Sequence, residues 1–219
     1  MTDLAARIAD AVSASGAVVD ALAGVDRVEA FRALDRWTYP VLRQALCTVN
    51  RFDAESMAVV RLYSSDPASY PPGGSKQKRG TPWGEHVLVQ RRVYVGEGAD
   101  AIRASFDDHA AILALGLQSV INVPVVAGGQ CLGTVNFLMR EARIDPAHVS
   151  FARLAAQLAT QHVVRMQPCE RLFQFLPAGS RRKNFDDQVI IDRSKDVQHV
   201  LPCHGHVASL IIERTGVRG

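Results

Sequence analysis

The sequence predicts an α+β fold: a central antiparallel β-sheet with N- and C-terminal helices on one face, and short helices plus a long loop on the other. The first observation is a hairpin, in which two β-rich runs, Ser119–Val126 and Cys131–Met139, flank Gly128-Gly129. The second is a helical pattern that opens at Asp145-Pro146, a favoured N-cap and first helical residue. The third is the stretch 64–83, whose prolines, glycines and basic residues predict a long loop.

Helices are expected at the N-terminal end of the chain. Leu4 to Leu22 is rich in Ala and Val, and Gly24 interrupts this pattern. Asp26 and Glu29 resemble a capping box, which predicts that a second helix begins there. Pro40 falls inside the apolar stripe of that helix, so we expect a kink or a break at this position.

The middle of the chain is expected to supply strands and the cover of the sheet. Met57–Tyr63 is a predicted strand, and so is the region His86–Val95, whose valines alternate in part. Residues 100–106 and 108–115 are predicted to form short helices. Together with the loop 64–83, which is longer than most loops in compact domains, they are the material left to cover the second sheet face.

The hairpin predicts which residues share a face of the sheet. A two-residue turn at Gly128-Gly129 would place Asn122 opposite Val135, so Asn122 and Asn136 are expected on opposite faces. Pro124 has no N–H to donate, which predicts an edge strand or a local irregularity. Both faces are largely apolar and need covering. A cover of loop and short helices packs imperfectly, which predicts a cavity.

Three segments are expected along the chain. Residues 1–24 form an N-terminal helix, residues 25–166 form the main domain, and residues 167–219 form a tail of unknown role. After Met166 the helical pattern ends, and short apolar runs alternate with Pro, Gly and charged residues, so we expect a poorly ordered tail. Cys203 and the histidines around it lack the spacing of a zinc site, and no metal is expected.

Several motifs in the hairpin and in the loop before it carry a family resemblance. They are Val123-Pro124-Val125, the Gly128-Gly129 turn, Leu132-Gly133-Thr134, the Tyr-Ser-Ser-Asp-Pro stretch Tyr63–Pro67 and the Tyr-Pro-Pro-Gly-Gly stretch Tyr70–Gly74. Together they resemble the GAF domain family, and most closely its small stand-alone bacterial members. The resemblance covers Phe31 to Met166.

The resemblance implies a central antiparallel sheet with a ligand cavity on one face, pairing through terminal helices, and a role in sensing. We therefore expect an unidentified small-molecule ligand and a homodimer, with no cofactor. The net charge of +3, from 25 basic and 22 acidic residues, is too balanced to indicate a nucleic-acid partner. No apolar run is long enough to predict a membrane span, and the widely spaced cysteines fit a reducing cytoplasm.

Candidate ligand-binding residues lie on the expected strands and in the loop. They are Arg61, Tyr63, Tyr70, Lys76, Lys78, Trp83, Asp108, Asn122 and Asn136. The loop could present cations and an aromatic ring to an acidic or planar ligand, although a solvated surface loop would have a similar composition. Strand alternation places Arg61 and Tyr63 on one face. The alternative for the two asparagines is a structural hydrogen-bond role, and for Asp108 it is helix capping.

An enzymatic alternative centres on Cys131. Some GAF-like enzymes reduce free methionine sulfoxide with several cysteines, and Cys131 would be the thiol of such a reductase here. No resolving partner is evident, because Cys47 is expected on a helix stripe and the other two cysteines lie in the tail. A packed structural thiol is the preferred interpretation, and no catalytic residue is assigned.

Overall fold

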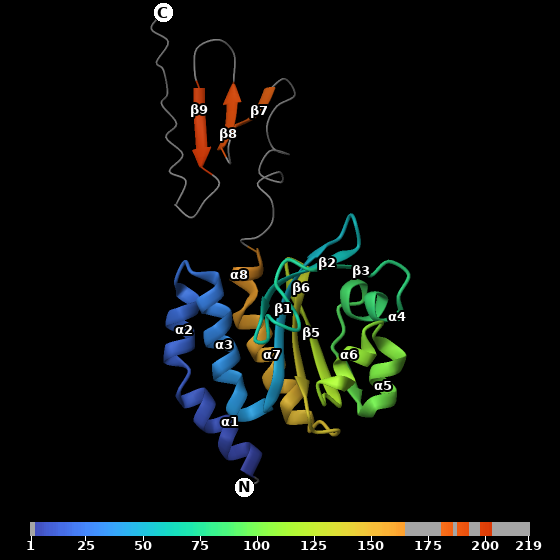
Figure 1. Ribbon diagram of the computed structural model, residues 1–219. Helices are drawn as coiled ribbons and strands as arrows, with labels where there is room; N and C mark the ends of the chain where they lie inside the picture. Colours follow the sequence, from blue (N-terminus) through green and yellow to red (C-terminus); the bar gives the residue numbers. More distant parts are fainter. Residues whose placement is uncertain (1–2, 165–180, 186–187, 193–197, 203–219) are drawn as a thin grey trace, which may run out of the picture. The chain divides into compact units, whose positions relative to one another are not determined.

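The computed structural model describes residues 3–164, 181–185, 188–192 and 198–202 (Figure 1). The chain divides into two compact units, Met1–Met166 and Gln167–Gly219. The first unit is built on a six-stranded antiparallel sheet in the order β3-β2-β1-β6-β5-β4, with helices on both faces. This architecture confirms the predicted α+β fold class. Within the described residues, no helix combines the length and the apolar character needed to cross a membrane.

Six strands form the sheet of the first unit. They are β1 (Gln44–Asp53), β2 (Ala58–Ser64), β3 (Ser75–Gln77), β4 (Tyr94–Glu97), β5 (Ser119–Ala127) and β6 (Gln130–Met139). The turn between β5 and β6 has positive φ at both Gly128 (55°) and Gly129 (73°), as a two-residue primed turn requires. The sequence pattern did not predict β1, and Cys47 lies in this strand and not on a helix stripe.

Helices from both ends of the first unit cover one face of the sheet (Figure 1). They are α1 (Asp3–Ser13), α2 (Gly16–Ala23), α3 (Arg27–Leu42), α7 (Pro146–Leu158) and α8 (Thr160–Val164). The predicted caps are confirmed, since Asp26 accepts a hydrogen bond from the Glu29 N–H and Asp145 from the Ala147 N–H. Helix α3 runs through Pro40 to its end. The region Leu4–Leu22 is two helices and not one.

Short helices and loops cover the opposite face of the sheet (Figure 1). They include α4 (Pro82–Gly84), the π-helical turn η1 (Glu85–Val89), α5 (Gly98–Ser105) and α6 (His109–Ala114). The strand predicted over His86–Val95 is therefore wrong for its first half, and only Tyr94–Glu97 joins the sheet. Val87 and Leu88 are consecutive and both buried against Trp83, a pattern that strand alternation does not produce.

The register of the hairpin differs from the prediction by one residue. A bulge between Val125 and Val126 shifts the pairing, so Asn122 lies opposite Asn136 and not opposite Val135. The two asparagines consequently share a face of the sheet, and the expectation that they point to opposite faces is wrong. Pro124 lies beyond the residues that pair with β4 and next to the bulge, as its missing N–H predicts.

The second unit contains three described strands. They are β7 (Arg181–Phe185), β8 (Gln188–Asp192) and β9 (Gln198–Pro202), which pair antiparallel in the order β7-β8-β9. Cys203 and two of the three histidines near it, at positions 204 and 206, lie outside the described residues.

Candidate ligand-binding site

A cavity of about 80 Å³ lies between the sheet and its cover of loop and short helices. This volume is several times what one water molecule needs. Its floor is formed by Leu46, Thr48 and Asn50 of β1, Val59 and Arg61 of β2, Val120 and Asn122 of β5, and Asn136 and Leu138 of β6. Its cover is formed by Tyr70, Gly74, Lys78, Trp83, Phe106, Asp108 and Ile112, and Lys76 of the edge strand β3 completes the lining. Eight of the nine candidate residues line this cavity.

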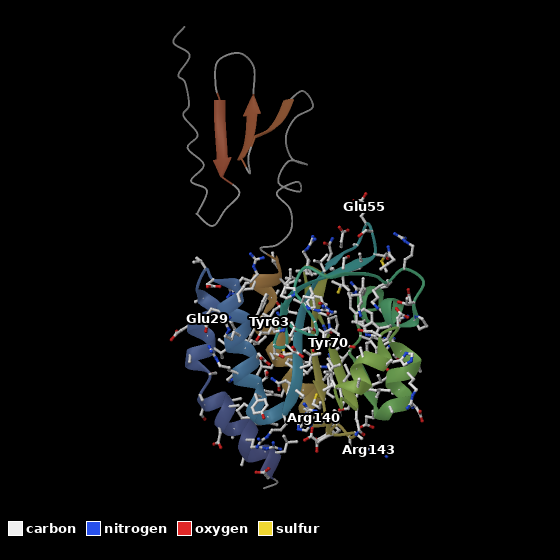
Figure 2. All side chains as sticks on the ribbon, in the orientation of Figure 1. Glu29, Glu55, Tyr63, Tyr70, Arg140 and Arg143 are labelled. Carbon is white, nitrogen blue, oxygen red and sulfur yellow. The ribbon has the colours of Figure 1, made fainter. Side chains whose placement is uncertain are left out.

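Tyr63 is the candidate that does not line the cavity. β2 has a bulge, because Arg61 pairs with Asn50 while Tyr63 pairs with Val49, and these two β2 residues therefore point to opposite faces. The Tyr63 hydroxyl donates to Asp35 at 3.1 Å in the core on the helical face, and burial raises its pKa. Figure 2 labels Tyr63 on the side of the helical layer and Tyr70 nearer the cover. The prediction from strand alternation, which placed Tyr63 on the same face as Arg61, is therefore wrong.

A row of side-chain hydrogen bonds crosses the floor of the cavity. The Trp83 indole N–H donates to Asn122 Oδ1 (2.9 Å), and Asn122 Nδ2 donates to Asn136 Oδ1 (2.8 Å). Asn136 Nδ2 in turn donates to Thr48 Oγ1 (3.1 Å). All four side chains are buried, so these bonds satisfy groups that water cannot reach. Both asparagines therefore line the cavity and also hold its structure, chiefly by fixing Trp83.

The segment from Lys78 to Gly84 folds back on itself and places Lys78 beside Trp83. The Thr81 hydroxyl donates to the Lys78 carbonyl oxygen (2.9 Å) and accepts from the Gly84 N–H (3.0 Å). A Cβ at Gly84 would clash with that carbonyl, so glycine permits the close approach. Lys78 Nζ lies 5.3 Å from the centre of the Trp83 ring, a cation–π contact. Lys78 is only 8% exposed.

Arg61 and Tyr70 form a second cation–aromatic pair on the cavity wall. The Arg61 guanidinium carbon lies 5.0 Å from the centre of the Tyr70 ring, and its Nη1 donates to the Pro71 carbonyl at 3.0 Å. Burial lowers the pKa of Arg61. Burial, with a smaller contribution from Asp108, raises the pKa of Tyr70 to about 12, so this hydroxyl stays protonated at neutral pH.

Asp108 joins the cover to an edge of the sheet. It occupies the N-cap position of α6, but its side chain makes no capping hydrogen bond. Its carboxylate instead accepts from Lys76 Nζ of β3 at 2.5 Å. The capping role proposed as the alternative for Asp108 is therefore wrong, and the ion pair ties β3 to α6.

The described cysteines are poor candidates for a reactive pair. Burial raises the pKa of Cys131 to about 11, and its Sγ–H donates to the Gly133 carbonyl at 3.4 Å. Cys47 is fully buried in the core on the helical face, where burial raises its pKa as well. Both environments disfavour the nucleophilic thiolate. Cys169 and Cys203 lie outside the described residues.

The sequence pattern missed the contribution of β1 and of the cover's apolar side chains. Leu46, Thr48 and Asn50 line the cavity at every second position, the spacing of one strand face. This two-residue spacing in the sequence could have indicated that the three side chains share one face of a strand. Phe106 and Ile112 belong to the segments expected as short helices, but no single-residue signal distinguished them.

Comparison with known proteins identifies the class of this domain. The sheet carries helices on one face and a cavity under a loop and short helices on the other. The GAF domain family model matches residues 40–164, more than half of the chain, and the chain belongs to the GAF domain family. GAF domains are a family of ligand-binding sensory domains. A search of curated protein sequences found no match.

Solved structures of other proteins share the fold at low sequence identity. The GAF domain of a phosphoenolpyruvate-protein phosphotransferase from Coxiella burnetii is 12% identical, with a TM-score of 0.58 over 79% of this chain and 98% of that chain. A GAF domain/HD domain protein from Geobacter sulfurreducens is 19% identical, with a TM-score of 0.54 over 67% and 97%. A far-red absorbing protein with bound biliverdin is 14% identical, with a TM-score of 0.52 over 67% and 94%.

Proposed function

We propose that this chain is a small-molecule sensor or regulator, which holds its ligand between the sheet and the loop and short helices of residues 64–118. The cavity at this place carries the proposal, because the other sheet face is filled by the core packed under the helices. Apolar side chains such as Leu46, Val120 and Leu138 line it together with a few placed polar groups. This combination is typical of small-molecule sites.

Release of a bound molecule tests the proposal directly. Denaturing the purified protein should release a small molecule detectable by mass spectrometry, and that molecule should raise the melting temperature of the ligand-free protein. Gly74→Phe should reduce both signals, since Gly74 lines the cavity at an exposed position where a large side chain would narrow the opening. Ser75→Phe is the matched control, because Ser75 is exposed and does not line the cavity. Undiminished ligand content in Gly74→Phe would argue against this location.

We also propose that the protein pairs as a homodimer through its N-terminal helices. Large apolar side chains are exposed there, including Val12 (48%) and Val19 (48%). Val12→Glu with Val19→Glu should halve the mass measured by light scattering, because two charges would be buried at the interface. Val89→Glu, an exposed position at the end of η1 and outside the N-terminal helices, should leave the mass unchanged. If the Val12→Glu/Val19→Glu variant has the same mass by light scattering as the unsubstituted protein, these helices do not form the interface.

A further inference from the structure

The cavity wall carries more positive than negative charge. Its charged lining residues are three cations, Arg61, Lys76 and Lys78, and one carboxylate, Asp108. Lys76 and Asp108 form an ion pair at 2.5 Å and neutralise each other. Among the described residues, neither Arg61 nor Lys78 has a carboxylate within ion-pair distance. The wall therefore keeps two uncompensated cations.

One of these two cations, Lys78, is also poorly solvated. Lys78 is 8% exposed, and its pKa is lowered by burial and, to a lesser extent, by the neighbouring Lys76. The attraction of Asp107 and Asp108 opposes that shift without forming a contact. A buried cation is costly unless an anion or several acceptors compensate it. An anion placed in the cavity would supply this compensation.

Hydrogen-bond donors on the same wall also lack acceptors. Arg61 Nε and the Tyr70 hydroxyl are buried without a partner among the described residues, and no acceptor in that part of the chain bonds Lys78 Nζ. The side-chain amide nitrogens of Asn122 and Asn136, in contrast, each donate to a partner. Each of these unpaired groups can donate a hydrogen bond, which favours a ligand rich in acceptor oxygens.

We propose that the ligand is a small organic anion, whose carboxylate or phosphate group binds at Lys78 Nζ beside Arg61 and Tyr70. This inference rests on the proposed ligand-binding function of the cavity. The apolar remainder of the ligand packs against the aliphatic floor formed by Leu46, Val120 and Leu138. Lys78 is the principal anchor, because the Thr81 turn and the Trp83 ring hold it in place.

A series of isosteric probes separates charge from shape. Benzoate, benzamide and benzamidine share a planar shape and carry charges of −1, 0 and +1, and phenylphosphonate offers the second kind of anionic group. Calorimetric titration gives each affinity, and the Trp83 indole N–H resonance reports binding inside the cavity. Benzoate or phenylphosphonate should bind at least tenfold more tightly than benzamide, and benzamidine should not bind. The stronger of the two anions indicates which head group the site prefers.

Substitution of Lys78 tests its role as the anchor. Lys78→Met should weaken binding of the preferred anion at least tenfold and leave benzamide unchanged. Its melting temperature should not fall, because the change removes a buried unpaired charge, and lost binding is then not a folding defect. Arg79→Met is the matched control: it removes a cation from the next, exposed position, which does not line the cavity, and anion binding should persist.

The outcomes distinguish this inference from the function on which it rests. Equal affinities for benzoate and benzamide, with no effect of Lys78→Met, would overturn the inference that the ligand is an anion. The proposal that the cavity binds a small molecule would still stand. Failure of every probe to shift the Trp83 resonance, together with no released small molecule, would overturn both.

Discussion

Replacing Gly133 with alanine is expected to lower the free energy of unfolding by about 3 kcal/mol. Gly133 lies in β6, paired with Arg51 of β1 on one side and Val125 of β5 on the other. A Cβ at this position would clash with the carbonyl oxygen of Asn50 and come within 3.0 Å of Val163. The clash is with backbone of a central strand, which cannot move aside without breaking the sheet pairing.

Chemical denaturation of Gly133→Ala and of a matched alanine variant measures this effect. Gly16→Ala is the control: nothing lies within 4 Å of the added Cβ, and Gly16 is in helix α2 without a positive φ. Alanine there should stabilise slightly, since it restricts the unfolded chain. A loss below about 0.5 kcal/mol for Gly133→Ala, the range of neutral surface changes, would contradict the close approach of β1 and β6.

Replacing Asn136 with alanine is expected to lower the free energy of unfolding by about 2–3 kcal/mol, because it leaves buried polar groups without partners. Asn122 Nδ2 would lose its acceptor and Thr48 Oγ1 its donor, and both residues are buried. The indole N–H of Trp83 should also become less protected against hydrogen exchange, since Asn122 would no longer be held in position.

Two further variants separate the hydrogen-bond network from simple loss of an amide. Asn50→Ala removes a half-buried amide from the same region of the sheet, with a single bond to Thr134, and should cost about 1 kcal/mol. Asn122→Ala combined with Asn136→Ala should cost less than the sum of the two single changes, because the partners of a broken bond are removed together. Additive effects would mean that the two amides do not interact.

Features set by local chemistry were predictable from the sequence. Asp26 and Asp145 are N-caps because their side chains reach a backbone N–H two or three residues away. Gly128-Gly129 forms the turn because both positions need positive φ. These signals do not depend on the rest of the fold. The composition of the loop pointed in the same way to four of the residues that line the cavity, Tyr70, Lys76, Lys78 and Trp83.

Features set by long-range pairing were not predictable in this way. The bulges beside Val125 and at Leu62 each move the residues beyond them to the opposite face of the sheet. Neither bulge can be recognised from the alternation of apolar and polar residues in the sequence. Strand β1 is buried on both faces and follows α3 directly. Arg43, and not a glycine, ends that helix in the left-handed conformation, so no turn signal separated helix from strand.

The hydrogen-bonded row across the cavity floor has a direction. An indole can only donate, so the oxygen of Asn122 must face Trp83 and its nitrogen must face Asn136. The same constraint passes to Asn136, whose nitrogen is directed to Thr48. The Trp83 indole, which can only donate, thus fixes the orientation of the side-chain amides of Asn122 on β5 and Asn136 on β6. A side chain able both to donate and to accept at position 83 would permit either orientation, and the floor of the cavity would lose its single pattern of polar atoms.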